Sequence, residues 1–234
     1  MNYLLMMMGG SGTRLGADRP KQYIEIDGKP VFAYIVEAYD KVACIDKMVI
    51  VSNAMWLDYV NEWCEKLNLN KPVIVTEGGP TRSHSVYFGM KAIAGEAKDK
   101  DVLLFHDATH PYVDEEGTIG VIEAIKEYGG ATLGEFQYDT VYSMDADGFI
   151  RNVIPRQEVV AGASPEGFTF GKIFPIYDQA DEEELANMTS AGAIALEHGI
   201  KMKTVQASVI NLKITYPNDM KAFKKIVHSY FFEQ

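Results

Sequence analysis

The sequence alternates short apolar segments with longer amphipathic ones through its first two-thirds. The apolar segments are bounded by turn residues and predict strands at Tyr3–Met8, Lys47–Ser52, Val73–Thr76, Asp101–Phe105 and Ala131–Phe136. The segments between them predict helices at Pro30–Lys41, Met55–Lys66, Arg82–Ala94 and about Glu115–Glu127. Continuous apolar strands separated by helices are typical of a mostly parallel sheet with helices on both faces. The chain is therefore predicted to have an α/β fold.

This pattern is interrupted between Gln137 and Gly162. The turn Asp147-Gly148, with an apolar segment on each side, predicts a β-hairpin that is too small to be a domain. We expect a single domain over residues 1–234, with an arm at about residues 137–162. After the arm, the sequence predicts helices at Gly171–Ala180 and Asn187–His198, strands at Lys203–Gln206 and Val209–Thr215, and a helix from Pro217.

The charge composition narrows the possible partners. The chain has 22 Lys and Arg residues against 33 Asp and Glu residues, a formal net charge of −11. Such a field repels nucleic acids and anionic membranes unless a basic patch overrides it, and no run of Lys and Arg stands out. The longest apolar run, Tyr3–Met8, is far shorter than the roughly 20 residues of a membrane-spanning helix. We expect a cytoplasmic protein that binds small anions where a few cations converge.

A glycine-rich loop, Gly9–Gln22, follows the first predicted strand. Glycines at this place allow backbone N–H groups to approach phosphate oxygens, although a structural turn explains the glycines alone equally well. No Gly-Lys-Ser/Thr closes the loop as in a Walker A motif, and the glycine spacing does not match a dinucleotide fingerprint. Arg14 and Lys21 add two cations at a site of polyphosphate size. The combination predicts a site for a polyphosphate.

Three loops are expected to lie together, because ligands of such sheets bind beyond the carboxyl ends of the strands: Gly9–Lys21, Glu77–Ser85 and His106–Val113. In the third loop, Asp107 follows a buried strand, where an acid is costly unless it meets water, a cation or a metal. Mg²⁺ is commonly held by one or two carboxylates together with substrate phosphates. The alternative is that Asp107 caps the next helix.

Two further cations have weaker signals when they are considered alone. Lys213 stands in the apolar segment Val209–Thr215, whose alternation could equally place it on a solvent-facing side. Arg156 follows Pro155 and, by itself, reads as a solvated surface arginine.

Together, the motifs resemble those of the cytidylyltransferases that make CDP-linked polyols, a family that includes the 2-C-methyl-D-erythritol 4-phosphate and ribitol-5-phosphate cytidylyltransferases. The likeness covers almost the whole chain, and its motifs occur in a compatible order. They are Gly10-Ser-Gly-Thr-Arg14, Pro20-Lys-Gln-Tyr23, Gly78-Gly-x-x-Arg-x-x-Ser85, His106-Asp-Ala108, Asp139-Thr140, Asn211-Leu-Lys-Ile-Thr215 and Pro217-x-Asp219.

The resemblance implies a Rossmann-like nucleotidyltransferase fold and a CTP-dependent transfer of CMP to a phosphorylated polyol, with release of pyrophosphate. It also implies Mg²⁺ as cofactor and a homodimer in which the arm completes the neighbouring subunit's site. It leaves open whether the acceptor is methylerythritol phosphate or ribitol phosphate, and therefore whether the product enters isoprenoid or cell-surface polymer synthesis.

The resemblance also assigns roles to single residues. The triphosphate would be bound by Gly9, Gly10, Ser11, Gly12, Arg14 and Lys21. The cytosine and ribose would be bound by Met8, Gly79, Ser85 and Ala108. Asp107 matches the metal-binding acid, and Thr140, Arg156 and Lys213 match positions that hold the polyol phosphate. Arg14, Lys21, Arg156 and Lys213 would be the catalytic cations.

The chain departs from the family pattern in the acceptor half. His110 stands where an arginine is usual, and Ala163-Ser-Pro-Glu166 replaces Gln-Thr-Pro-Gln. Ser190-Ala-Gly192 replaces a threonine that is followed by two acids. The alternative hypothesis is therefore a non-catalytic nucleotide or sugar-phosphate sensor that derives from such an enzyme.

Overall fold

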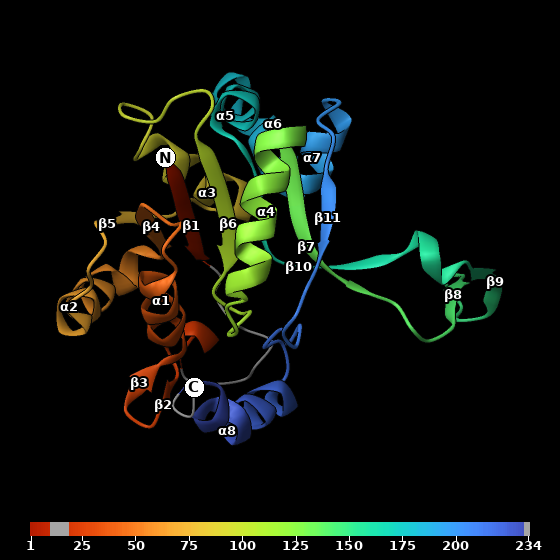
Figure 1. Cartoon of the computed structure of the whole chain (residues 1–234), viewed down its shortest axis with the longest axis horizontal. Coiled ribbons are helices and arrows are strands. Elements are labelled where there is room, and N and C mark those ends of the chain that lie inside the picture. Colours follow the sequence, from red (N-terminus) through yellow and green to blue (C-terminus); the bar gives the residue numbers. More distant parts are fainter. Residues whose placement is uncertain (10–18, 232–234) are drawn as a thin grey trace.

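The computed structural model describes residues 1–9 and 19–231, and within them a seven-stranded sheet with the order β11-β7-β10-β6-β1-β4-β5 (Figure 1). Its strands are β1 (Asn2–Met8), β4 (Lys47–Ser52), β5 (Val73–Glu77), β6 (Val102–Asp107), β7 (Gly130–Phe136), β10 (Val160–Thr169) and β11 (Lys203–Gln206). β1 pairs in parallel with β4 and β6, β4 with β5, and β11 with β7, whereas β10 is antiparallel to both of its neighbours. The predicted mostly parallel sheet is confirmed.

Helices cover both faces of this sheet (Figure 1). They are α1 (Val31–Lys41), α2 (Leu57–Leu67), α3 (Arg82–Lys91), α4 (Glu115–Tyr128), α5 (Phe170–Gln179), α6 (Glu182–Asn187), α7 (Ala191–Glu197) and α8 (Pro217–Phe231). Among the described helices, none combines the length and the apolar character that a membrane crossing requires.

Two separate apolar cores explain why the strands are continuously apolar. On β1, Leu4 and Met6 join a core with α1, α2, α4 and α8, whereas Tyr3 and Leu5 join a second core with α3, α5, α6 and α7. Successive side chains of a strand point to opposite faces, so both sets are buried. At roughly 1.5–3 kcal/mol for each large apolar side chain, this burial is the main force that assembles the sheet and its helices.

Short elements complete the structure. The 3₁₀ helices are η2 (Lys21–Tyr23), η3 (Ala54–Trp56) and η4 (Arg156–Glu158), and β2 (Glu25–Ile26) pairs with β3 (Lys29–Pro30). Asp27 and Gly28 join these two strands with φ angles of 52° and 76°, a backbone conformation that glycine adopts without strain.

The predicted arm is present as a hairpin of β8 (Val141–Met144) and β9 (Ile150–Ile154), which pair with each other and not with the central sheet. It projects from the end of β7 (Figure 1). The chain re-enters the central sheet at Val160, where β10 begins, two residues before the approximate limit predicted for the arm. Several large apolar side chains of the hairpin are exposed: Tyr142, Met144, Phe149, Ile150 and Val153.

Two predictions in the second half are wrong. The sequence predicts no strand at β10, because this segment contains Pro165 and several small residues; the sheet accommodates them through a shift in register between Gly162 and Glu166. The sequence predicts a strand at Val209–Thr215, but the segment is an irregular connection that pairs with no strand of the described sheets. One of its backbone groups, the Ile214 N–H, donates to the Thr109 carbonyl at 2.7 Å.

The predicted helix Asn187–His198 is also wrong in its limits. The structure ends α6 at Asn187 and begins α7 at Ala191. The side chains of Asp181 and Glu184 form a capping box that starts α6, and Ser190 caps α7 by accepting from the Ala193 N–H at 3.1 Å. The two caps therefore start two separate helices, α6 and α7. The apolar pattern of the sequence did not indicate α6, which begins in the acidic segment after Ala180.

Candidate active site

The carboxyl ends of β1, β4 and β6 lie side by side and bring the predicted loops together. Met7 is in register with Asp107, and Met8 with Ser52. The Ala108 N–H donates to the Met7 carbonyl at 3.1 Å, so the first residue after β6 is tied to the end of β1. The position beyond the strand ends therefore carries the described candidate residues of the central sheet and of the loops that follow its strands.

The predicted nucleotide residues on β1 and α3 are in close contact. Ser85 Oγ accepts a hydrogen bond from the Gly79 N–H at 3.1 Å and donates to the Thr81 carbonyl at 3.0 Å. A Cβ atom placed on Gly9 would lie 3.0 Å from Ser85 Oγ, and one on Gly78 would lie 2.7 Å from it. A side chain at either glycine would therefore crowd the Ser85 hydroxyl, which contacts the loops after β1 and β5.

The residues after the glycine-rich loop are fastened to the end of β1. Gln22 Nε2 donates to the Met8 carbonyl at 2.7 Å, and Tyr23 OH lies 2.9 Å from the Ser52 hydroxyl. Lys21 Nζ donates to the Ile214 carbonyl, one residue away from Lys213. Gly10, Ser11, Gly12 and Arg14 lie outside the described residues, so their predicted roles stay predictions.

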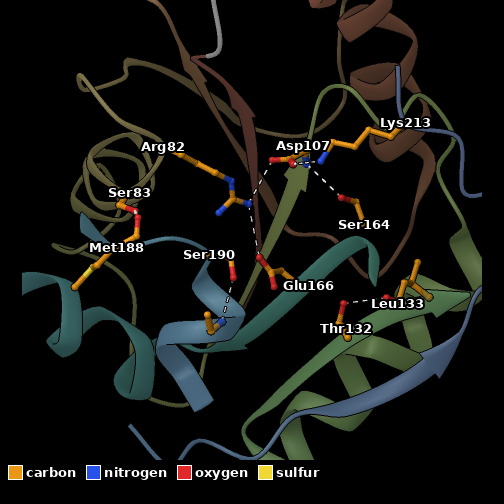
Figure 2. A network of polar contacts seen from close by, with 11 residues as sticks. Arg82, Ser83, Asp107, Thr132, Leu133, Ser164, Glu166, Met188, Ser190 and Lys213 are labelled. Carbon is orange, nitrogen blue, oxygen red and sulfur yellow. Dashed lines mark hydrogen bonds and ion pairs between the residues drawn. The ribbon is translucent and has the colours of Figure 1, made fainter. Parts of the chain in front are cut away.

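Asp107 is the centre of an ionic network (Figure 2). Arg82 Nη2 lies 3.4 Å from its Oδ1, and Lys213 Nζ lies 3.3 Å from its Oδ2. The same Arg82 nitrogen lies 3.6 Å from Glu166 Oε1. Burial alone would raise the pKa of Asp107, but the nearby charges of Arg82 and Lys213 outweigh it and hold this pKa below its ordinary value. Asp107 is therefore ionised at neutral pH.

The register of the sheet explains why Arg82 and Glu166 meet Asp107. Glu166 on β10 is paired with Phe105, two residues before Asp107, so these three side chains belong to the same face of the sheet. That face is the one covered by α3, whose first residue is Arg82. The Asp107 N–H also points to the Ser164 hydroxyl of β10 at 3.5 Å.

Two buried histidines shape the turn after β6. His106 is fully buried; its Nε2–H donates to the His110 carbonyl at 2.8 Å, and its Nδ1 accepts from Tyr39 OH at 2.9 Å. Burial lowers the pKa of His106 and of His110 to about 4 in each case. His110, which stands at the family's arginine position, is therefore neutral at physiological pH and adds no positive charge.

Asp107 does not cap the following helix. Asp114 is the N-cap of α4, where its Oδ1 accepts from the Gly117 N–H at 2.8 Å. The capping interpretation of Asp107 is wrong, because β6 continues through Asp107 and the helix begins only at Glu115.

The arm residues are not part of this cluster within one chain. Thr140 directly precedes β8, and Arg156 begins η4, shortly after β9. The hairpin of β8 and β9 projects away from the sheet and from β6 (Figure 1). Arg156 Nη1 donates to the Tyr138 carbonyl at 2.5 Å and is exposed. In the isolated chain, Arg156 is therefore a solvated surface arginine, as its sequence context alone indicates.

Sequence reasoning assigned no role to Arg82 or Glu166, although the structure places both beside Asp107. Arg82 belongs to the Gly78–Ser85 motif, and Glu166 is one of the departures from the family pattern. Both features could have indicated residues of the site. What the sequence could not show is that they form one network with Asp107 (Figure 2).

The donor set around Asp107 fits a Mg²⁺ ion that is held mainly by substrate. Among the residues that the structure describes, no three His, Cys, Asp or Glu side chains group as metal ligands. Asp107 is an ionised carboxylate with a quarter of its side chain exposed, and it is in register with Met7 near the end of β1, the strand that precedes the predicted polyphosphate loop. One carboxylate together with phosphate oxygens and water is a common Mg²⁺ arrangement.

The chain is similar to known proteins over almost its whole length. The family model for 2-C-methyl-D-erythritol 4-phosphate cytidylyltransferase matches residues 3–229. A ribitol-5-phosphate cytidylyltransferase of Streptococcus agalactiae is 29% identical over 97% of this chain and 95% of its own length. A 2-C-methyl-D-erythritol 4-phosphate cytidylyltransferase of Clostridium acetobutylicum is 30% identical over 97% of both chains.

A solved structure shows the same fold. The 4-diphosphocytidyl-2C-methyl-D-erythritol synthase of Anaerococcus prevotii superimposes with a TM-score of 0.81 at 23% identity, covering 97% of this chain and 96% of that one. The expected nucleotidyltransferase fold is confirmed.

Proposed function

The chain belongs to the 2-C-methyl-D-erythritol 4-phosphate cytidylyltransferase family, and from this we infer that it transfers the cytidylyl group of CTP to a polyol phosphate. The observation that carries this inference is the position of Asp107. It ends β6 with one cation on each carboxylate oxygen, and it stands beside the loop that begins at Gly9. Cations that converge beyond the strand ends are suited to hold the phosphates of two substrates.

In the proposed reaction, a phosphate oxygen of the acceptor attacks the α-phosphorus of CTP. The new P–O bond forms as the bond to the β-phosphate oxygen breaks, and pyrophosphate leaves with the bonding electrons. No covalent enzyme intermediate is required, because positioning and charge stabilisation supply most of the rate in such transfers.

We propose that Lys21 and Lys213 bind different substrates. We assign Lys21, with Arg14, to the triphosphate and Lys213 to the acceptor phosphate. The contact between Lys21 and the Ile214 carbonyl supports this assignment, because it brings the two lysines to the same segment of the chain. A donor phosphate and an acceptor phosphate would then be held next to each other.

We propose that Asp107 holds Mg²⁺. When bound, the ion would supply positive charge to the triphosphate and to the leaving pyrophosphate. The chain's own contribution is a carboxylate that Arg82 and Lys213 keep ionised.

We propose that the arm pairs with a second copy of the chain. A two-stranded hairpin is marginally stable alone in water, and this one exposes Tyr142, Phe149 and Ile150. Pairing with the same arm of a second chain would bury these side chains in a symmetric way. Thr140 and Arg156 would then serve the neighbouring subunit's site.

The deciding experiment follows pyrophosphate release from CTP and Mg²⁺ with methylerythritol phosphate, ribitol 5-phosphate and other polyol phosphates in parallel. We expect release with one of these acceptors and none with the same polyol lacking its phosphate. The Asp107→Asn variant provides the background rate. Tight CTP binding without release for any acceptor would instead support the non-catalytic sensor.

A further inference from the structure

Arg82 is shared between two carboxylates. Its Nη2 atom lies 3.4 Å from Asp107 Oδ1 and 3.6 Å from Glu166 Oε1 (Figure 2). Both distances exceed the roughly 2.7–2.9 Å of a close charge-assisted hydrogen bond. Arg82 therefore does not form a close ion pair with Asp107 alone, because it interacts with Glu166 at a similar distance.

The charges of this network are balanced only when Glu166 is counted. Asp107 faces Arg82 on one oxygen and Lys213 on the other. Without Glu166, two cations would face one carboxylate, and that carboxylate is the proposed Mg²⁺ ligand. The one positive charge left uncompensated beside Asp107 would repel a divalent ion that approaches it.

The surrounding structure is built to hold Glu166 in place. Its side chain is 19% exposed. Burial raises the pKa of the Glu166 carboxyl, and the charge of Arg82 and a hydrogen bond from the Gly192 N–H oppose that rise, so the carboxylate depends on both partners for its charge. A Cβ atom on Gly192 would lie 3.0 Å from Glu166 Oε2, closer than nearly all real contacts of that kind. A carboxylate that is mostly buried is costly unless it is paired, so Arg82 and Gly192 together account for its position.

We propose that Glu166 is a positioning residue for the metal: it draws the charge of Arg82 away from Asp107, so that Asp107 retains the negative potential that a divalent cation requires. This inference rests on the proposed function, in which Asp107 holds Mg²⁺. Glu166 acts through Arg82 and touches neither substrate nor metal. Its charge, and not its size or its packing, carries the effect.

The test measures the affinity of the full chain for a non-reacting CTP analogue, cytidine 5′-(α,β-methylene)triphosphate, by calorimetry at pH 8 with and without Mg²⁺. We define the metal gain as the Kd measured without Mg²⁺ divided by the Kd measured with Mg²⁺. This ratio isolates the contribution of the ion to binding. The Kd without Mg²⁺ also shows whether each variant is folded.

We expect Glu166→Gln to reduce the metal gain about threefold to fivefold, the range of partly exposed charge pairs. The double variant Arg82→Gln/Glu166→Gln should recover most of the loss, because it also removes the cation that Glu166 balances. Glu197→Gln is the matched control: it removes one charge at the exposed end of α7, and it should leave the metal gain unchanged.

An unchanged metal gain in Glu166→Gln, or a double variant that stays as low as the single one, would overturn the inference. Asp107→Asn separates this failure from that of the proposed function. If Asp107→Asn abolishes the metal gain, only the role of Glu166 is wrong. If the gain survives in Asp107→Asn, the assignment of Mg²⁺ to Asp107 is overturned, and the role of Glu166 with it.

Discussion

The two oxygens of Asp107 face cations from distant parts of the chain, Arg82 of α3 and Lys213 of the connection before α8. The histidines beside them are neutral, because burial lowers the pKa of His106 and His110 to about 4. In the described part of the site, the positive charge at neutral pH therefore comes from arginine and lysine. Such a site keeps its charge between pH 5 and 8, the range in which exposed histidines titrate.

At the residue scale, Lys21→Ala should lower kcat/KM by about 10² through lost charge stabilisation of the triphosphate. Lys21 stands in a short 3₁₀ helix at the start of the chain's first hairpin, so the fold should be retained. Steady-state pyrophosphate release checks the effect, with Lys41→Ala at the exposed end of α1 as the matched control. Near wild-type release from Lys21→Ala would remove this residue from the triphosphate site.

At the scale of elements, two buried side chains join the strands and helices that carry the site. His106 of β6 connects the Tyr39 hydroxyl of α1 to the His110 carbonyl of the turn after the strand. Asp114 at the start of α4 accepts from the Ser208 N–H at 2.6 Å and from its hydroxyl at 2.8 Å. The contact between Asp114 and Ser208 fixes the segment that leads to Lys213.

The buried state of His106 predicts a loss of stability in acid. Its pKa falls from 6.5 to about 4 on folding, so between these values the unfolded chain binds a proton that the folded chain does not. Stability therefore decreases as the pH falls below about 6.5, by about 2 kcal/mol from this group at pH 5.

Urea unfolding of the wild type and of His106→Asn at pH 7 and pH 5 measures this contribution. The variant should be less stable at pH 7, because the Tyr39 and His110 contacts are weakened. Its further loss between pH 7 and pH 5 should be about 2 kcal/mol smaller than that of the wild type. Equal losses would mean that His106 does not titrate as its burial requires.

At the scale of the whole molecule, the arm is the part that the isolated chain leaves without a partner. β8 and β9 pair only with each other, and their large apolar side chains are exposed (Figure 1). Thr140 directly precedes β8 and Arg156 follows β9, so both residues belong to the arm. In the dimer proposed above, a second chain would supply these two residues to the site.

Mixed dimers test this arrangement. An Arg156→Ala chain and an Asp107→Ala chain should each be nearly inactive alone, and a mixture should regain activity, because one of the two sites in a mixed dimer has neither defect. With equal amounts and random exchange, half of the dimers are mixed, so recovery should approach about a quarter of the wild-type rate. No recovery after confirmed exchange of subunits would show that the arm does not serve a neighbour.

The sequence by itself determined the elements whose signals are local. β4 and β11 have the predicted limits, Lys47–Ser52 and Lys203–Gln206, because a run of strand-forming residues is enough to define them. Asp107 and Lys213 were identified from the order of the motifs, and the structure brings them within 3.3 Å of each other. The family and its reaction also follow from these motifs.

Tertiary structure alone decided what depends on partners far away in the chain. β10 contains Pro165 and small residues, and it becomes a strand because β6 and β7 provide backbone partners on both sides. The connection Val209–Thr215 has a strand's alternation, yet it pairs with no strand of the described sheets. The pairing of Arg82 with Glu166 has the same origin: it joins residues from opposite halves of the chain, and only the packing of α3 on the face that carries β10 brings their charges together.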